Sequence, residues 1–348
     1  MRQLVIVGLI AAAFSASAMS ASKPAKTPSD AKPATKQDAQ PVPIQTHLRD
    51  ISIRFVDFYD RASKPAPVPP APPAAPAAPA ADGKQAAVAP VAPPAPVESE
   101  QDRRWRFFKQ AYGFSAQPDD AATRVALEAA WPRYEAVMPQ IRAGYDSIAP
   151  EWSSITTGVV SRLALAGSKP FEFRVVSYVG TFEGKVWTAQ EGDLLNVYLP
   201  LEVSPDARML PLARIIARLA LQREAAWGAQ PRNLTELAIN EGIYAHVLKD
   251  VVPGKTTAEY LDMTPEQFTK VSASAKTDLK AMQPKLRDGS PATLAQYSAQ
   301  MDQVRYAGWL LVDQMTKANV RYVDLMHQKQ ADLMGVAVKS AGVIARAK

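Results

Sequence analysis

The chain has 348 residues, of which 47% are apolar, and it carries a formal net charge of +6 at neutral pH. That length and apolar content are enough for a sizeable core, in one large domain or two small ones. Lys and Arg are spread among Asp and Glu, which argues against a nucleic-acid-binding protein, because phosphate-binding surfaces usually show a basic stripe. The absence of cysteine excludes disulfides, thiolate metal ligands and cysteine nucleophiles.

The first 18 residues have the pattern of a secretory signal peptide. Arg2 precedes an apolar run over residues 4–14, and Ala16 and Ala18 form an A-x-A cleavage signal. That run is too short for a permanent membrane span, and no later stretch reaches about 18 uninterrupted apolar residues, so we predict no integral membrane span. We expect a protein of the bacterial periplasm or the medium, since the lack of cysteine fits an envelope compartment.

Two segments have compositions typical of disorder. Residues 19–43 are rich in Lys, Ala, Pro, Thr and Gln without a periodic apolar pattern, and we interpret them as a spacer. Residues 63–98 are dominated by Pro and Ala, with twelve prolines among Lys64–Val97. Proline fixes φ and removes a backbone donor, so this segment is predicted to be extended and polyproline-like.

The segment between these two, residues 44–62, has the spacing of an amphipathic helix. Its apolar residues at helical spacing are Leu48, Ile51, Phe55 and Phe58. A helix of this length needs a partner surface to be stable. The Pro/Ala-rich segment that follows is therefore either a linker or an insertion. We favour an insertion, with the helix belonging to the main domain at 99–345.

The main domain is predicted to be α+β and mainly α-helical, with a small mixed or antiparallel sheet packed on two central helices. Before the sheet, the pattern predicts helices over 102–112, 121–148 and 153–165, the second of them broken or kinked at Pro132 and Pro139. Strands are predicted within 171–182 and 185–203, and the two central helices follow within Leu210–Val252. The rest of the chain is predicted to be helical, with helix starts at Thr264 and Ser290. The aromatic stripe of Trp105, Phe108 and Tyr112 is interpreted as core.

The chain has only three histidines, and no two of them have the spacing of metal ligands on one helix. They are His47, His246 and His327. Glu241 and His246 are five residues apart, about 140° around a helix, so they do not converge on one ion. The sequence also lacks the G-x-S-x-G and phosphate-binding glycine motifs. We therefore predict no metal, no cofactor and no catalytic residue.

Several stretches together resemble the predicted zinc-dependent protease families of exported bacterial proteins, in the gluzincin-like clan. They are RFVDFYDRA (54–62), VVSYVGTFEGKVWT (175–188), LPLARIIARLAL (210–221), LTELAINEGIYAHVLKDVVPG (234–254) and YAGWLLVDQM (306–315). In those families one helix carries H-E-x-x-H and a later helix carries E-G-x-A with a carboxylate ligand. Here Arg214-Ile215-Ile216-Ala217-Arg218 replaces H-E-x-x-H, whereas Glu241 matches the later carboxylate.

This resemblance implies a zincin-like fold without zinc ligands or a general base at positions 214, 215 and 218. It suggests a pseudo-metallopeptidase that binds a peptide or an envelope partner in a cleft lined by Arg214, Arg218, Glu241 and an edge strand near 175–182. One of the two arginines would neutralise Glu241 by a fork-like salt bridge; alternatively, both form a solvent-exposed polar face. The other functional hypotheses are an active hydrolase with an unrecognised constellation and a structural envelope protein.

Overall fold

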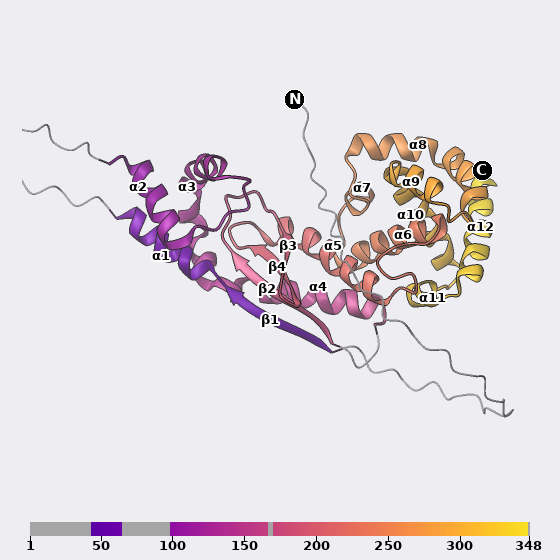
Figure 1. The fold of residues 1–348 in the computed structure, drawn as a ribbon, viewed down its shortest axis with the longest axis horizontal. Helices are drawn as coiled ribbons and strands as arrows, with labels where there is room; N and C mark the ends of the chain where they lie inside the picture. The colour runs from indigo at the N-terminus through magenta and orange to yellow at the C-terminus, as the bar shows by residue number, and fades with distance from the viewer. Residues whose placement is uncertain (1–42, 65–97, 166–169, 347–348) are drawn as a thin grey trace, which may run out of the picture. The chain divides into compact units, whose positions relative to one another are not determined.

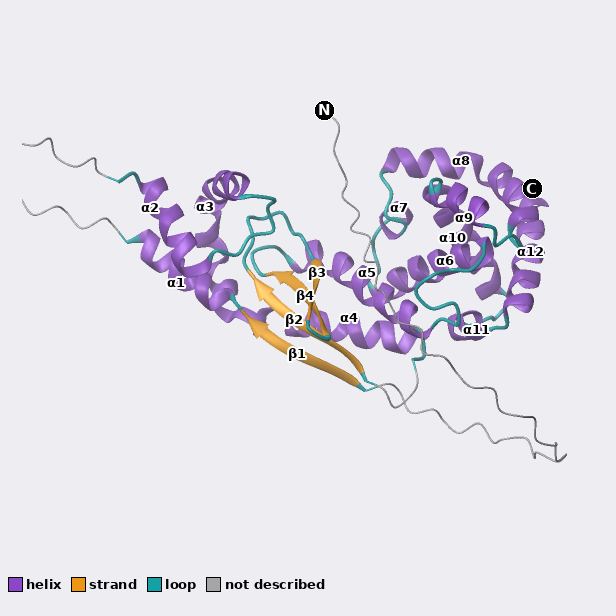
Figure 2. Ribbon diagram, viewed as in Figure 1, coloured by secondary structure: helices purple, strands orange, loops and turns teal. Residues whose placement is uncertain are grey.

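The computed structural model describes residues 43–64, 98–165 and 170–346. The predicted signal peptide, nearly all of the spacer at 19–43 and nearly all of the Pro/Ala-rich segment at 63–98 lie outside this part of the chain. Within the described residues the fold is α+β and mainly helical, as predicted (Figures 1 and 2). None of the described helices combines the length and apolar character needed to cross a membrane.

Four strands of the described residues form one mixed sheet in the order β1-β2-β4-β3. The strands are β1 (Ile44–Asp50), β2 (Phe171–Tyr178), β3 (Trp187–Glu191) and β4 (Leu194–Pro200). β1, β2 and β4 are parallel, and β3 runs antiparallel to β4. β3 and β4 are joined by a two-residue turn in which Gly192 has a φ of +63°, a conformation that glycine adopts without strain. The sheet is thus mixed.

The first helix is shorter than its sequence pattern suggested. Residues 44–50 form a strand, and only α1 (Ser52–Ser63) is helical, which corrects the predicted helix over 44–62. Residues 44–50 instead pair along their whole length with β2, more than a hundred residues further on. Phe55 and Phe58 on α1 are buried, and Phe55 packs edge-on against Tyr112 at 5.4 Å. α1 therefore belongs to the same core as the residues after the Pro/Ala-rich segment.

Most of the remaining described residues are helical. Between α1 and β2 the helices include α2 (Glu100–Phe107), the π-helix η1 (Phe108–Tyr112), α3 (Asp120–Ala143) and α4 (Ala149–Arg162). After β4 they include α5 (Pro205–Glu224), α6 (Leu234–Val251), α7 (Thr257–Tyr260), α8 (Pro265–Met282), α9 (Pro291–Ser298), α10 (Met301–Lys317), α11 (Tyr322–His327) and α12 (Gln330–Arg346). Thr264 and Ser290 cap α8 and α9, as the sequence predicted.

Three local features refine or correct the predictions. α3 is not broken at Pro132 and Pro139, which both lie on its exposed side, where water can satisfy the carbonyl groups that lose their helical partner. α4 begins at Ala149 with Pro150 in its first turn, four residues before the predicted start at 153. Finally, 175–182 is not an edge, because β2 lies between β1 and β4.

Candidate functional site

α5 carries residues 214–218, which the sequence resemblance matches to H-E-x-x-H, and a buried arginine fixes the start of this helix. Pro205 stands in the first turn, where a missing N–H costs nothing. Arg208, 1% exposed, donates to both carboxylate oxygens of Glu151 on α4 at 2.6 and 2.7 Å. It also donates to the carbonyl groups of Pro200 and Val203, at and just after the end of β4. α5 is therefore held against both α4 and the sheet.

α6, the helix that carries Glu241, is buried over most of its length. Asn233 caps it by accepting a hydrogen bond from the N–H of Glu236 at 2.9 Å. α6 also packs against α10, and the two helices meet at Gly242 and Gly308. A Cβ atom on Gly308 would lie 2.0 Å from the carbonyl oxygen of Ala238, so only glycine permits this approach. The close contact fixes α6, and with it the position of Glu241.

Arg218 and Glu241 form a fork-like salt bridge between α5 and α6. Nη2 of Arg218 donates to Oε2 of Glu241 at 2.9 Å, and Nη1 donates to Oε1. Nε of Arg305, on α10, lies 3.4 Å from the same Oε2. The Glu241 side chain is 3% exposed, whereas that of Arg218 is 34% exposed. A buried carboxylate thus has two cationic partners, which compensate for much of its lost hydration.

An aromatic ring completes the surroundings of Arg218. Its guanidinium carbon lies 3.9 Å from the centre of the Tyr244 ring, a cation–π geometry. Burial alone would lower the pKa of Arg218, but the hydrogen bonds to Glu241 and its charge outweigh that effect and raise the pKa. Burial raises the pKa of Tyr244 to about 12, although the nearby arginines oppose the shift. At neutral pH, Arg218 is therefore charged and Tyr244 is a neutral phenol.

Arg214 and Ile215 do not join this salt bridge. Arg214 binds Asp262 at 2.9 Å and the carbonyl oxygen of Glu259 at 2.5 Å, beside and just after α7. Ile215 is half-buried and packs against the core. Of the two arginines that the sequence offered as the partner of Glu241, Arg218 forms the salt bridge and Arg214 does not. Neither arginine forms the freely solvated polar face that was the alternative.

A small pocket adjoins the salt bridge. It has a volume of about 180 Å³ and lies between α5, the α5–α6 loop and α6. Arg218 and Glu241 line it together with the polar side chains of Gln222 and Asn240. Asn240 also accepts a hydrogen bond from the indole N–H of Trp227 at 3.3 Å. The pocket therefore offers amide groups and one partly exposed guanidinium, but no imidazole.

The three histidines lie in different parts of the structure and have different contacts. His47 pairs with Glu172 at 2.8 Å on the sheet, and His327 is exposed at the end of α11. His246 is 5% exposed, and its ring stacks on that of Trp309 with 3.9 Å between the ring centres. Across residues 43–64, 98–165 and 170–346, no group of three His, Asp or Glu side chains is arranged to hold a metal ion.

A buried carboxyl group at the end of the sheet was not among the predicted site residues. Glu202 follows β4, is 2% exposed and accepts a hydrogen bond from the N–H of Gly180 at 2.8 Å. Burial raises its pKa to about 7, although the hydrogen bond opposes this shift. Three buried tyrosines, Tyr112, Tyr134 and Tyr178, have raised pKa values, chiefly through burial, with the charge of Glu202 adding to the effect. A lone glutamate in the apolar run LPLEV was its only sequence signal.

We expect Glu202 to make the protein less stable as the pH rises. Its folded-state pKa of about 7 exceeds the ordinary value of 4.5. The unfolded chain therefore loses this proton first, and the free energy of unfolding falls by up to about 3 kcal/mol between pH 4.5 and 7. Urea denaturation at pH 5 and pH 8 measures this fall. Glu202→Gln removes it, and Glu135→Gln, at an exposed helix position, retains it. A fall of unchanged size in Glu202→Gln would refute the assignment.

The chain has no match among protein-family models, and no curated protein matches it.

Proposed function

We propose that this chain is a zincin-like protein that lacks the catalytic metal, is exported from a bacterial cell and binds an extended peptide. The order of elements supports the zincin-like part of the proposal. A mixed sheet with one antiparallel edge strand is followed by α5, which carries the replaced motif, and then by α6, which carries the retained Glu241. The export part depends on the signal-peptide pattern in residues 1–18.

The Arg218–Glu241 salt bridge is the main observation that supports a protein without zinc-dependent catalysis. A zinc peptidase of this type needs two imidazoles one turn apart, a carboxylate ligand and a general base. Here the carboxylate is occupied by a guanidinium that stands at the position of the second imidazole. Ile215, at the position of the general base, has no group that could accept a proton. A cation from the protein itself takes the place of the metal charge.

The outer edge of β3 is the surface that we assign to the peptide. Within the described residues β3 has a neighbouring strand, β4, on one side only. The residues that flank the two-residue turn, Glu191 and Leu194, form a hydrogen-bonded pair in such a hairpin, and the pattern then alternates along the strand. Thr188 and Gln190 therefore direct their backbone N–H and C=O groups outwards, and both residues are exposed. An extended peptide can add to these groups as a further strand.

Replacing Thr188 by proline should weaken peptide binding with little effect on the fold. Proline removes an outward N–H but no bond of the β3–β4 ladder. We expect the affinity for fluorescein-labelled casein, measured by fluorescence polarisation, to fall about tenfold, since one lost main-chain bond to the peptide is worth about 1.4 kcal/mol. Thr188→Val keeps the N–H and serves as the matched control, with affinity near that of the parent protein.

Two outcomes would contradict the proposal. If Thr188→Pro binds casein as tightly as Thr188→Val does, the peptide does not add to β3. If the purified protein cleaves casein and a chelator stops the cleavage, the protein is an active metallopeptidase. Loss of binding in Thr188→Pro, with no cleavage by any variant, supports both parts of the proposal.

A further inference from the structure

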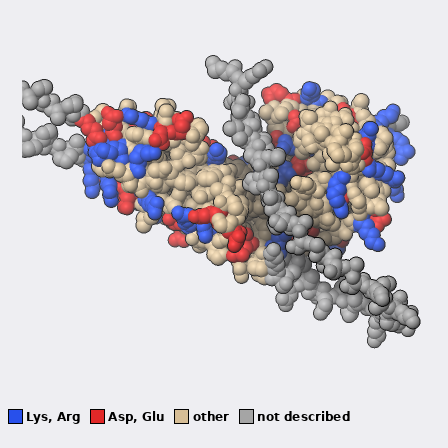
Figure 3. Space-filling view, viewed as in Figure 1, with Lys and Arg blue, Asp and Glu red and all other residues tan. Residues whose placement is uncertain are grey.

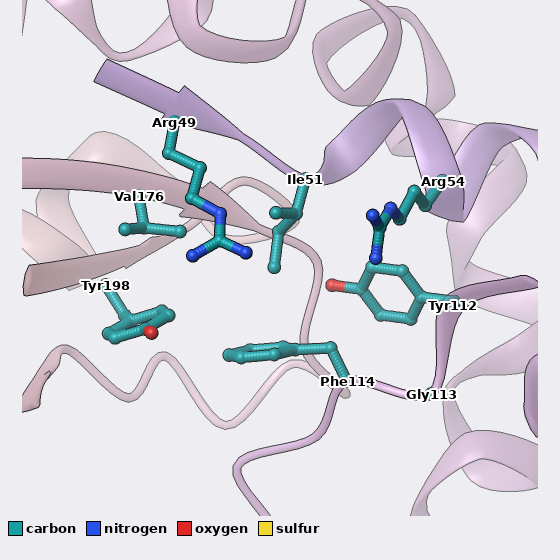
Figure 4. Close-up of a pocket in the computed structure, with 8 residues that line it drawn as sticks. All are labelled: Arg49, Ile51, Arg54, Tyr112, Gly113, Phe114, Val176 and Tyr198. Atoms are coloured by element: carbon teal, nitrogen blue, oxygen red, sulfur yellow. The ribbon is translucent and has the colours of Figure 1, made fainter. Parts of the chain in front are cut away.

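A second pocket lies on the face of the sheet that is turned away from α4 and α5, near the carboxyl ends of the three parallel strands (Figure 4). Its volume is about 180 Å³. Arg49, Val176 and Tyr198 are directly paired across β1, β2 and β4, so their side chains share one face of the sheet. Ile51, Arg54 and Phe114 line the pocket from α1 and from the loop after η1. The site is thus formed by four separate segments of the chain, namely 49–54, 112–114, β2 and β4.

Flat aromatic rings form one wall of this pocket. The ring of Tyr198 stacks on that of Trp187 at 3.9 Å with an angle of 1° between the planes. Phe114 lies nearly parallel to both rings, at 5.4 Å from Tyr198 and 5.9 Å from Trp187. Figure 4 shows the rings of Phe114 and Tyr198 side by side on the same wall, facing the guanidinium of Arg49. Such a wall can receive a further aromatic ring by stacking.

Positive charge is in excess at the opposite wall. The guanidinium of Arg54 forms no hydrogen bond or ion pair with any residue of the described part of the chain. Arg49 has Glu191 as its partner at 3.2 Å, but Glu191 also binds Arg174 at the shorter distance of 2.8 Å. Figure 4 shows the guanidinium groups of Arg49 and Arg54 on either side of Ile51. Arg49 and Arg174 therefore share the carboxylate of Glu191, and Arg54 has no carboxylate partner among the described residues.

The start of α1 does not add to this preference, because a carboxylate already lies there. No acidic residue lies in its first turn, but Oδ1 of Asp50 accepts a hydrogen bond from the N–H of Ser52, the first residue of the helix, at 2.8 Å. The nearest carboxylate in the sequence, Asp50, follows Arg49 directly, so its side chain lies on the opposite face of the sheet. Its oxygens accept hydrogen bonds from Ser52, from the hydroxyl of Ser177 and from the N–H of Tyr145. Asp50 is therefore engaged on that other face.

We propose that this pocket binds a carboxylate attached to a single aromatic ring. The carboxylate would pair with Arg54 and Arg49, while Glu191 stays on Arg174, and the ring would stack on Phe114 and Tyr198. The size fits, since a cavity of about 150 Å³ accommodates benzene. This ligand chemistry occurs in free aromatic acids and at the end of a peptide whose last residue is aromatic. The site is separate from the Arg218–Glu241 salt bridge and from the outer edge of β3.

Calorimetric titration of the full chain tests this proposal. The probe is 3-phenylpropionate, and its neutral control is 3-phenylpropanamide. We expect the acid to bind at least about tenfold more tightly than the amide, and Arg54→Gln to remove about tenfold of that affinity, as for the loss of one charge-assisted contact. Arg61→Gln removes the same charge from an exposed position in the last turn of α1 and should leave the affinity within about twofold.

A second titration distinguishes the two sources of the ligand. Tighter binding of N-acetylphenylalanine than of 3-phenylpropionate assigns the site to a peptide end, and the reverse order assigns it to a free aromatic acid. Either order supports the proposal. Failure of both acids to bind, equal affinity for acid and amide, or equal affinity in Arg54→Gln and Arg61→Gln would overturn it. Because Thr188 is not altered in any of these proteins, the result is independent of the peptide-binding test on β3.

Discussion

Replacing Arg218 by methionine should lower the free energy of unfolding by about 3 kcal/mol, because it leaves the buried charge of Glu241 without its fork partner. The Glu241 side chain is 3% exposed, so water cannot replace the two lost hydrogen bonds. Methionine keeps much of the length of the arginine chain, and therefore the loss reports charge and hydrogen bonding more than packing. Arg305, whose Nε is 3.4 Å from Glu241, retains part of the compensation. Urea denaturation measures the change.

Two further variants show whether the cost comes from the unpaired carboxylate. Arg218→Met combined with Glu241→Leu removes both charges, and we expect it to recover most of the lost stability, since apolar pairs often match buried ion pairs. Arg214→Met breaks a more exposed pair with Asp262, and it should cost less than about 1 kcal/mol. If the Arg218 and Arg214 variants lose equal stability, the salt bridge to Glu241 does not hold α5 against α6.

Replacing Gly308 by alanine should cost about 3 kcal/mol or more, which is at the upper end for overpacking of a core. The added Cβ would lie 2.0 Å from the carbonyl oxygen of Ala238 and 3.0 Å from the backbone nitrogen of Gly242. Both atoms belong to the backbone of α6, so no side chain can turn aside and the two helices must separate. Thermal and urea denaturation report the loss.

Gly335→Ala is the matched control for this change. Gly335 lies within α12, and a Cβ there meets nothing within 4 Å. Alanine should therefore leave stability unchanged or raise it by up to about 1 kcal/mol through helix propensity. Equal stability of the Gly308 and Gly335 variants would contradict the close approach of α6 and α10.

Local chemistry made much of the helical part of the fold predictable. Thr264 and Gln267 form the capping box that their spacing indicated, and Ser290 caps α9. A salt bridge of Glu241 to either Arg214 or Arg218 was also predicted from the sequence, and the structure shows that the partner is Arg218. The mixture of charges was readable too: Figure 3 shows Lys and Arg interspersed with Asp and Glu on the visible face, without a single basic stripe.

Features that depend on distant pairing were not predictable in this way. Residues 44–50 fit a helical spacing locally, but their backbone groups find partners on β2, which a periodicity within one segment cannot reveal. For the same reason 175–182 looked like an edge, although β1 covers it on one side and β4 on the other. The sequence left open which of the two arginines binds Glu241, because Asp262, the partner of Arg214, lies in the loop after α7.

The pocket of Arg49 and Arg54 was not predictable for a related reason. Its aromatic wall combines Phe114, Tyr198 and Trp187, which meet only once the sheet has formed. No motif in the sequence joins these residues. Figure 3 shows acidic and basic groups together at the end of the molecule that holds α1 and α2. Charge alone would therefore not have distinguished Arg54 from its neighbours.

We propose that positions 214, 215, 218 and 241 are those of a zinc site in which Arg218 has taken the place of the metal charge. Restoring the motif by Arg214→His, Ile215→Glu and Arg218→His, with Glu241 unchanged, tests this proposal most directly. We predict that this variant, folded by circular dichroism, binds one equivalent of zinc by metal analysis, whereas the parent protein binds none. Glu241→Gln added to that variant should weaken zinc binding at least about tenfold, as loss of a ligand does. Stoichiometric zinc in the parent protein, or no zinc in the restored variant, would contradict the account.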